Sequence, residues 1–221
     1  MVTINSLPTA SVSNDTTICV GDTASLVASG GTTYQWSPDS TLSNAFIAAP
    51  SAFPTLSATY QVIISDPNGC NDTAEVTVTI QNLPTINAGV DQTICVNDTA
   101  QLNASGGVTY VWTPADSLSA TTTSDPFAWP ADSSSYVVTG ADAIGCVFSD
   151  TVNVFVNPLP VADAGADAWI CPGDNIQLGA SGGVAYTWSP STGLSNPNIA
   201  DPTTTLTDTV IYSVEVVSAD G

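Results

Sequence analysis

An eleven-residue stretch occurs three times in this sequence, and the spacing between copies is constant. Residues 28–38 read ASGGTTYQWSP, residues 104–114 read ASGGVTYVWTP, and residues 180–190 read ASGGVAYTWSP, so successive copies begin 76 residues apart. The dipeptide Leu-Pro keeps the same spacing, at Leu7-Pro8, Leu83-Pro84 and Leu159-Pro160. Because self-similarity at a fixed period defines the unit of folding, the chain is predicted to fold as small repeats.

The Leu-Pro dipeptides mark the predicted domain boundaries. Repeat 1 comprises residues 7–82, repeat 2 residues 83–158, and repeat 3 residues 159–221, which stops before the counterpart of its final Cys and its last strand. Residues 1–6 overlay the end of repeat 1 and are predicted to be the last strand of a preceding repeat. We therefore expect the chain to be a segment of a longer array.

Each repeat carries the pattern of short β-strands. Apolar and polar residues alternate over residues 23–29, 33–36, 59–65 and 74–80, and the last two segments flank the turn sequence DPNG. Alternation with a period of two predicts half-buried strands, and no segment has a helical period. The predicted fold is all-β, with tandem Ig-like β-sandwich domains joined by short Leu-Pro linkers into a linear rod.

The aromatic residues that recur at the 76-residue spacing are the predicted core. Tyr34 and Trp36 are two residues apart on one strand and so share a face, where a Trp packs between two sheets. Tyr60 opens the penultimate strand and is predicted to form a tyrosine corner. An alternative is that Trp36, Trp112 and Trp188 form a stacking platform for sugars. The predicted core positions are Tyr34, Trp36, Tyr60, Tyr110, Trp112, Tyr136, Tyr186, Trp188 and Tyr212.

The five cysteines follow the same register. Cys19 and Cys70 are 51 residues apart, as are Cys95 and Cys146. The same spacing would place the partner of Cys171 at position 222, one residue past the end of the sequence. Disulfides within each repeat are predicted, in an oxidising extracellular setting. Two alternatives remain: a Cys70–Cys95 bond between neighbouring repeats, which leaves Cys19 for an earlier repeat, and buried free thiols.

The charge composition excludes several functions. The sequence has 20 acidic residues and no Lys, Arg or His. Binding to nucleic acid or to an anionic membrane surface needs cations. A catalytic triad needs His, and a Schiff base needs Lys. Asp occurs mainly in turn sequences, where its side chain bonds the local backbone. The chain is therefore predicted not to be an enzyme and to need no cofactor.

Residues that break the repeat are the candidates for contacts outside the core. Trp129 replaces Phe53 and becomes Thr205 in repeat 3, and Trp169 stands where Thr17 and Thr93 stand. The two tryptophans are possible contacts for a glycan or a protein. Asp91, Asp163 and Asp167 follow the Leu-Pro joints and are weak candidate Ca²⁺ ligands, because hard cations prefer carboxylate oxygens.

The order of Leu-Pro, Cys, Ala-Ser-Gly-Gly, Tyr-x-Trp and Gly-Cys in each copy resembles the Ig-like and PKD-like repeats of large Bacteroidota cell-surface proteins. The chain departs from the PKD signature Trp-Asp-Phe-Gly-Asp-Gly and has Tyr-Gln-Trp-Ser-Pro at residues 34–38. The resemblance implies a structural segment of an extracellular fibre, stalk, gliding filament or adhesin, exported by the type IX system. Its partners would be neighbouring repeats of the same chain and identical chains in a filament or bundle.

The same resemblance raises a possible modification. Short Asp-Thr and Asp-Ser words resemble the O-glycosylation sequon used by Bacteroidota: Asp22-Thr23-Ala24, Asp72-Thr73-Ala74, Asp98-Thr99-Ala100, Asp116-Ser117-Leu118 and Asp150-Thr151-Val152.

Overall fold

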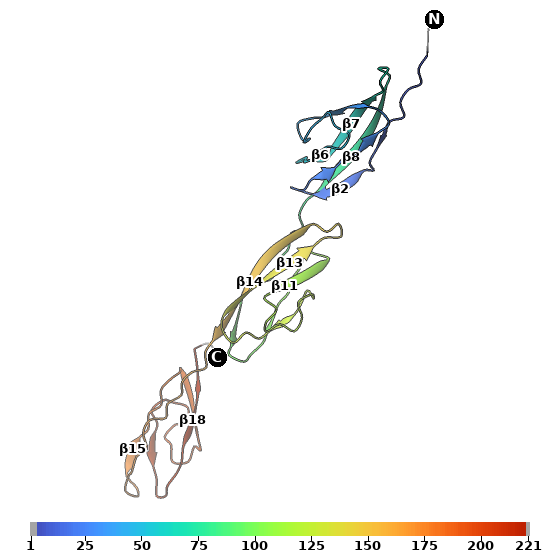
Figure 1. Cartoon of the computed structure of the whole chain (residues 1–221). Helices are drawn as coiled ribbons and strands as arrows, with labels where there is room; N and C mark the ends of the chain where they lie inside the picture. The colour runs from blue at the N-terminus through green and yellow to red at the C-terminus, as the bar shows by residue number, and fades with distance from the viewer. Residues whose placement is uncertain (1–3, 220–221) are drawn as a thin grey trace. The chain divides into compact units, whose positions relative to one another are not determined.

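A computed structural model describes residues 4–219 of the chain (Figure 1). These residues form β-strands, turns and extended segments and contain no helix, which confirms the predicted all-β class. It follows that no helix within residues 4–219 is long and apolar enough to cross a membrane. Of the predicted strand at residues 1–6, residues 4–6 lie outside any strand, and residues 1–3 are outside the described part, as are residues 220–221.

Repeat 1 is a sandwich of two layers. One layer has the strand order β2-β8-β7-β5, and the other combines the pairs β1-β4 and β3-β6. The backbone N–H groups of Leu26 and Ala28 extend the β3-β6 pairing by donating to the carbonyls of Pro50 and Ala48. This is the strand arrangement of an Ig-like sandwich. Its strands are β1 (Ser11–Val12), β2 (Thr16–Cys19), β3 (Ala24–Ser25), β4 (Ala28–Ser29), β5 (Thr33–Ser37), β6 (Ser51–Ala52), β7 (Ala58–Ser65) and β8 (Asn71–Gln81).

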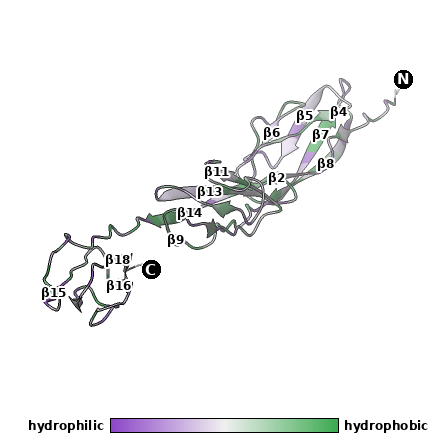
Figure 2. Ribbon diagram, turned by 90° about the horizontal axis from the view of Figure 1, so that it is seen from below, coloured by the Kyte–Doolittle hydropathy of each residue, from purple (hydrophilic) through white to green (hydrophobic). Residues whose placement is uncertain are grey.

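The core of repeat 1 lies between these layers. Along β7, Tyr60, Val62 and Ile64 are buried while Gln61 and Ile63 between them are exposed, as the predicted alternation requires. The buried residues of β7 contact Leu26 and Trp36, among others, in one apolar cluster. Figure 2 shows hydrophobic residues as green segments within the strands, β7 among them.

Repeats 2 and 3 contain part of the strand set of repeat 1 at the 76-residue spacing. Within the described residues, repeat 2 has a single bridge where repeat 1 has β1 and β4, and repeat 3 also lacks a counterpart of β2. The Trp strand pairs in the same antiparallel register each time, with Trp36 opposite Val62, Trp112 opposite Val138 and Trp188 opposite Val214. The strands of repeat 2 are β9 (Gln92–Cys95), β10 (Ala100–Gln101), β11 (Thr109–Thr113), β12 (Phe127–Ala128), β13 (Ser134–Ala141) and β14 (Val147–Asn157); those of repeat 3 are β15 (Asn175–Gln177), β16 (Ala185–Ser189), β17 (Thr203–Thr205) and β18 (Ser213–Val217).

The Gly-Gly turn of the repeated stretch has a steric cause. Gly30 has a φ of 115°, which L side chains rarely adopt, and a Cβ there would overlap the carbonyl oxygen of Thr9. Gly106 meets the carbonyl of Thr85 in the same way, and Gly182 that of Val161. Glycine is needed where the backbone takes a positive φ and another chain segment approaches closely. The peptide bonds before Pro38, Pro114 and Pro190 are cis.

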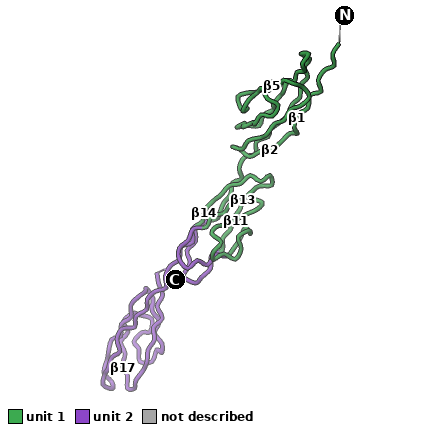
Figure 3. The backbone as a smooth tube through the Cα atoms, in the orientation of Figure 1, with its two compact units in different colours: residues 1–89, 101–126, 136–152 green, residues 90–100, 127–135, 153–221 purple. Residues whose placement is uncertain are grey.

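The chain divides into two compact units. One comprises residues 1–89, 101–126 and 136–152, and the other residues 90–100, 127–135 and 153–221 (Figure 3). The division between the two units passes through repeat 2.

Candidate functional site: an inter-repeat disulfide

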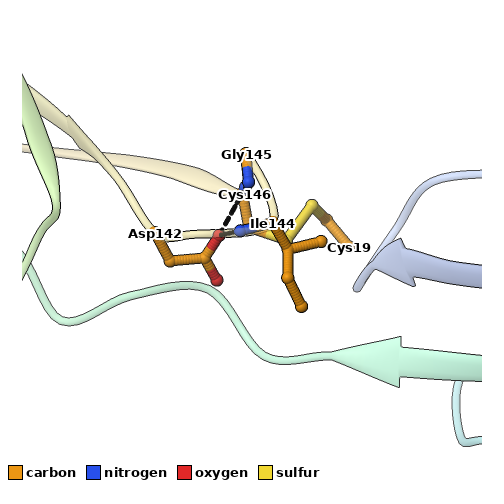
Figure 4. The surroundings of a disulfide bond; sticks show 5 residues. All are labelled: Cys19, Asp142, Ile144, Gly145 and Cys146. Carbon is orange, nitrogen blue, oxygen red and sulfur yellow. Dashed lines mark hydrogen bonds between the residues drawn. A yellow bond between two sulfur atoms is a disulfide. The ribbon is translucent and has the colours of Figure 1, made fainter.

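A disulfide joins repeat 1 to repeat 2 within the first compact unit. Cys19, the last residue of β2, bonds to Cys146 in the turn before β14, with 5.5 Å between their Cα atoms and 127 residues between them in sequence (Figure 4). The predicted Cys19–Cys70 and Cys95–Cys146 bonds within repeats are therefore wrong. The alternative Cys70–Cys95 bond is wrong too, because Cys70 is not in a disulfide.

The strand topology explains why a bond within one repeat is impossible. β2 runs parallel to β8, and Cys19 lies opposite Gln81 at the far end of β8. Cys70 directly precedes the first residue of β8, which is 11 residues long. At about 3.3 Å per residue, roughly 36 Å separate the two cysteines, whereas a disulfide needs Cα atoms within about 7 Å. In repeat 2, Cys95 lies opposite Asn157, a full strand length from Cys146.

The turn that presents Cys146 is organised by one carboxylate. Oδ1 of Asp142 accepts hydrogen bonds from the backbone N–H groups of Ile144, Gly145 and Cys146, each at 2.9 Å (Figure 4). The turn closes with a bond from the N–H of Asp142 to the carbonyl of Cys146. Cys146 itself is buried. The side chain of Asp142 thus holds the sulfur-bearing residue in one conformation.

The charge of Asp142 is stabilised without a cation. Desolvation, the largest single influence, raises its pKa, but hydrogen bonds from the backbone of Cys146, Ile144 and Gly145 together with the Gln81 side chain bring the pKa below the ordinary value. Oδ2 of Asp142 is buried and has no hydrogen-bond partner. The backbone N–H groups on Oδ1 therefore lower the pKa of Asp142 more than the Gln81 side chain does. Gln81 belongs to repeat 1 and lies opposite Cys19.

The sequence contained a signal for this turn that the interpretation missed. An Asp stands four residues before Cys70 and before Cys146, in DPNGC and DAIGC. In repeat 1, Oδ1 of Asp66 accepts from the N–H groups of Asn68 and Cys70, at 2.9 and 2.8 Å. Both turns therefore have the same hydrogen-bonded frame, although only Cys146 is in a disulfide.

The three recurring tryptophans are buried core residues, as predicted. Trp36, Trp112 and Trp188 are 2%, 1% and 3% exposed. Each indole N–H donates to a backbone carbonyl 11 residues later, in Ile47, Thr123 and Ile199. Rings enclosed in this way cannot stack on a sugar, so the platform alternative is wrong for these residues.

The recurring tyrosines occupy two kinds of position. Tyr60 and Tyr136 are fully buried, whereas Tyr212 is half-buried and packs edge-on against Trp188. The hydroxyl groups of the half-buried Tyr34, Tyr110 and Tyr186 donate to the carbonyls of Gly31, Gly107 and Gly183.

The predicted tyrosine corner is not formed by Tyr60. A tyrosine corner bonds the backbone a few residues upstream. The hydroxyl of Tyr60 instead bonds Oγ1 of Thr41 at 2.6 Å, 19 residues earlier in the chain. The turn closed by the N–H of Leu42 and the carbonyl of Asp39 brings Thr41 to that end of the ring.

Trp129 and Trp169 are surface residues. Trp129 is 45% exposed and Trp169 is 91% exposed. Thr17 and Thr93, the counterparts of Trp169, are exposed as well, so this position faces solvent in every repeat. Trp169 lines a shallow depression together with Ile170, Cys171, Asp174 and Asn175.

The three candidate Ca²⁺ ligands do not converge. Oδ1 of Asp91 accepts from the backbone N–H of Asn153 at 2.8 Å, and this bond, followed by those of the Asn153 side chain, holds the pKa of Asp91 below its usual value. Oδ1 of Asp163 accepts from the N–H of Gly165, and Asp167 is exposed. Within residues 4–219 no three acidic, Cys or His side chains lie close enough to hold a metal ion together.

Comparison with known proteins gives matches among solved structures only. No family model and no curated protein matches the sequence. The N-terminal eight Ig domains of Down syndrome cell adhesion molecule isoform 1.30.30 are 14% identical, with a TM-score of 0.42, and the match covers 91% of this chain and 38% of that one. Extracellular domains 3–5 of Drosophila OTK are 9% identical, with a TM-score of 0.39 and coverage of 97% and 93%. The insect immune protein hemolin is 14% identical, with a TM-score of 0.35 and coverage of 68% and 46%.

Proposed function

We propose that this chain is a non-catalytic structural segment of a long extracellular fibre, stalk or adhesin on a bacterial cell surface. The observation that carries the proposal is the Cys19–Cys146 bond, which crosslinks consecutive Ig-like repeats. Disulfides persist in oxidising compartments, which supports an extracellular location. The resemblance of the repeats to those of Bacteroidota surface proteins supports the same role.

A crosslink of this connectivity changes how the chain carries tension. Force applied at the two ends passes through residues 1–19, across the disulfide, and on from residue 146. Residues 20–145, which include Trp36 and Trp112, lie outside this covalent path, so their unfolding would not lengthen the chain. A tandem array that holds a cell or a particle at a distance needs this property, because the array then keeps its length when a repeat unfolds under load.

The acidic composition supports a solvated, extended array. A net charge of −20 with no cation makes like segments repel one another, and the repulsion weakens when salt screens it. Copies that associate side by side must meet through neutral or apolar surface or through bound metal ions. We propose that the repeats form a linear rod of crosslinked sandwiches under these conditions.

Single-molecule pulling of the whole chain between terminal handles tests the proposal. With the disulfide intact, the fully stretched chain should be shorter than the reduced chain by the 127 enclosed residues, about 440 Å at about 3.5 Å per residue. Cys19→Ser should release this length without reductant, and Cys70→Ser should not. A hidden length of only about 180 Å, the value for 51 residues between Cys19 and Cys70, would overturn the proposal.

A second candidate function is binding of a glycan or protein, and the exposure of Trp169 favours it. An aromatic ring in solvent next to polar groups is a common contact for such ligands. Glycan-array binding of the chain, repeated with Trp169→Ala and Trp129→Ala, tests this candidate. Binding that survives both substitutions removes the two tryptophans as contacts.

A further inference from the structure

The Cys19–Cys146 disulfide joins two sulfurs in different surroundings. Cys146 is 1% exposed, whereas Cys19, at the end of β2, is half-buried. A thiol reductant in solution therefore reaches the Sγ of Cys19 more readily than the Sγ of Cys146. Attack at Cys19 breaks the S–S bond so that the electron pair stays on the Cys146 sulfur, which leaves as a thiolate. The stability of that thiolate controls how fast the bond is reduced.

The sulfur that leaves lies beside a carboxylate. Oδ1 of Asp142 accepts from the backbone N–H of Cys146 at 2.9 Å (Figure 4). Three covalent bonds separate that nitrogen from the Sγ of Cys146, so the carboxylate lies within about 7 Å of the sulfur. The turn holds the carboxylate there, because Oδ1 also accepts from Ile144 and Gly145 and the N–H of Asp142 donates to the carbonyl of Cys146.

The carboxylate of Asp142 is charged at neutral pH, and no cation neutralises it. Desolvation raises its pKa, but hydrogen bonds from the backbone of Cys146, Ile144 and Gly145 and from the Gln81 side chain bring the pKa below the ordinary value. None of these groups carries a charge, and the sequence has no Lys, Arg or His that could pair with the carboxylate. Its second oxygen, Oδ2, is buried without a hydrogen-bond partner.

A thiolate released at Cys146 would be a second negative charge in this turn. A nearby like charge disfavours the ionised form of a group, and burial disfavours it as well. Cysteines that exchange readily have a thiolate stabilised by a cationic side chain or by a helix N-terminus. The sequence has no cationic side chain, and residues 4–219 contain no helix. The Cys146 thiolate is therefore a poor leaving group.

We propose that the Asp142 carboxylate protects the Cys19–Cys146 disulfide against thiol reductants, because it destabilises the Cys146 thiolate that reduction must release. Asp142 acts through Cys146 and not on the reductant, so it is a positioning residue whose charge has a function beyond framing the turn. The inference deepens the proposed role as a tether and rests on it, since a crosslink that carries tension must outlast contact with reductants.

Reduction takes place in two exchange steps. A thiolate of the reductant attacks the Sγ of Cys19, forms a mixed disulfide with it and displaces the Cys146 thiolate, which takes up a proton from water. A second reductant thiolate attacks the reductant sulfur of the mixed disulfide and displaces the Cys19 thiolate. Two reductant thiols become one disulfide, and the protein gains two electrons and two protons. The first step creates the unfavourable pair of charges at Asp142 and Cys146.

Reduction rates of matched variants test this inference. The parent carries Cys70→Ser, Cys95→Ser and Cys171→Ser, which leaves only the two cysteines of the disulfide. With excess 2-mercaptoethanol at pH 8, Asp142→Asn should be reduced about three- to tenfold faster than the parent. The amide oxygen of Asn can still accept the backbone bonds, so this variant removes the charge and keeps the turn. Asp66→Asn changes the net charge equally in the corresponding turn and should leave the rate unchanged.

Two further measurements separate the charge from a loosened turn. Hydrogen exchange of the Cys146 amide should be equally slow in the parent and in Asp142→Asn, and mixed disulfide trapped with N-ethylmaleimide should be found at Cys19. Equal reduction rates in Asp142→Asn and the parent would overturn the inference. So would faster reduction with equally faster amide exchange, or mixed disulfide mainly at Cys146. Pulling of single chains tests which residues the bond encloses, whereas these rates test what protects it, so the two proposals fail independently.

Discussion

The indole N–H of Trp36 donates to the backbone carbonyl of Ile47 at 3.0 Å, 11 residues later. The same bond joins Trp112 to Thr123 and Trp188 to Ile199. Because the acceptor belongs to the main chain, the side chain at that position is free to differ between repeats. The bond therefore anchors the loop after each Trp strand without constraining its sequence.

Removal of one of these tryptophans should destabilise its repeat strongly. Trp112→Ala leaves a large cavity and an unsatisfied carbonyl on Thr123, so we expect a loss of about 3–5 kcal/mol in the free energy of unfolding. Denaturant unfolding followed by circular dichroism measures it. Trp169→Ala is the matched control and should change stability by no more than about 0.5 kcal/mol, because the ring is exposed. Equal losses in the two variants would contradict the assignment of Trp112 to the core.

Two glycines with similar backbone angles should respond differently to alanine. Gly106 and Gly145 have φ of 91° and 102°, but only at Gly106 would a Cβ overlap another segment, at the carbonyl of Thr85. Gly145→Ala should cost about 1–2 kcal/mol for the left-handed conformation alone. Gly106→Ala should cost about 1–3 kcal/mol more, because the Thr85 backbone must move. Thermal unfolding of both variants gives the comparison, and a smaller loss at Gly106 would rule out the close approach.

The Cys19–Cys146 bond should make a large contribution to stability. For a loop of 127 residues the chain-entropy model gives about 5 kcal/mol. Cys19→Ser should therefore lower the unfolding midpoint of the oxidised protein, and added reductant should then have little further effect on it. Cys70→Ser is the matched control and should leave the midpoint unchanged in dilute solution, where chains do not associate.

Acid should weaken the turn that presents Cys146. Backbone hydrogen bonds to its carboxylate hold the folded-state pKa of Asp142 below the ordinary value of an Asp side chain, so its charged form is favoured by folding. This contribution is fully present above the unfolded-state value and is lost as the pH falls through the folded-state pKa. Asp142→Asn should flatten the decline in stability below about pH 4. Unfolding midpoints of the wild type and of Asp142→Asn, measured between pH 2 and pH 7, test this prediction. An equally steep decline in both proteins would contradict it.

Chelation should not change the stability of the chain. The carboxylate of Asp91 already accepts hydrogen bonds from Asn153, and Asp163 accepts one from Gly165. We therefore expect the same melting midpoint in EDTA and in millimolar CaCl₂. A midpoint that rises with CaCl₂ and falls with EDTA would restore Asp91, Asp163 and Asp167 as ligands.

Much of each sandwich could be predicted from the sequence because its signals are local and occur three times. Alternation of apolar residues located β7 and β8, and the recurrence of Trp36 at one register placed it in the core. The Gly-Gly turn was visible as a pattern, but its cause was not. Only the structure shows that Thr9, 21 residues before Gly30, passes against the turn.

The partner of each cysteine was decided by the tertiary structure. Equal spacing suggested that Cys19 bonds Cys70, since spacing along the chain says nothing about the direction in which strands run. The parallel pairing of β2 with β8, between residues 62 positions apart, carries Cys19 to the opposite end of the sandwich from Cys70. The hydroxyl partner of Tyr60 depended likewise on a turn 19 residues away. Local sequence specifies which residues are buried in a strand, but contacts between distant segments depend on strand direction and register, which only the assembled sheets define.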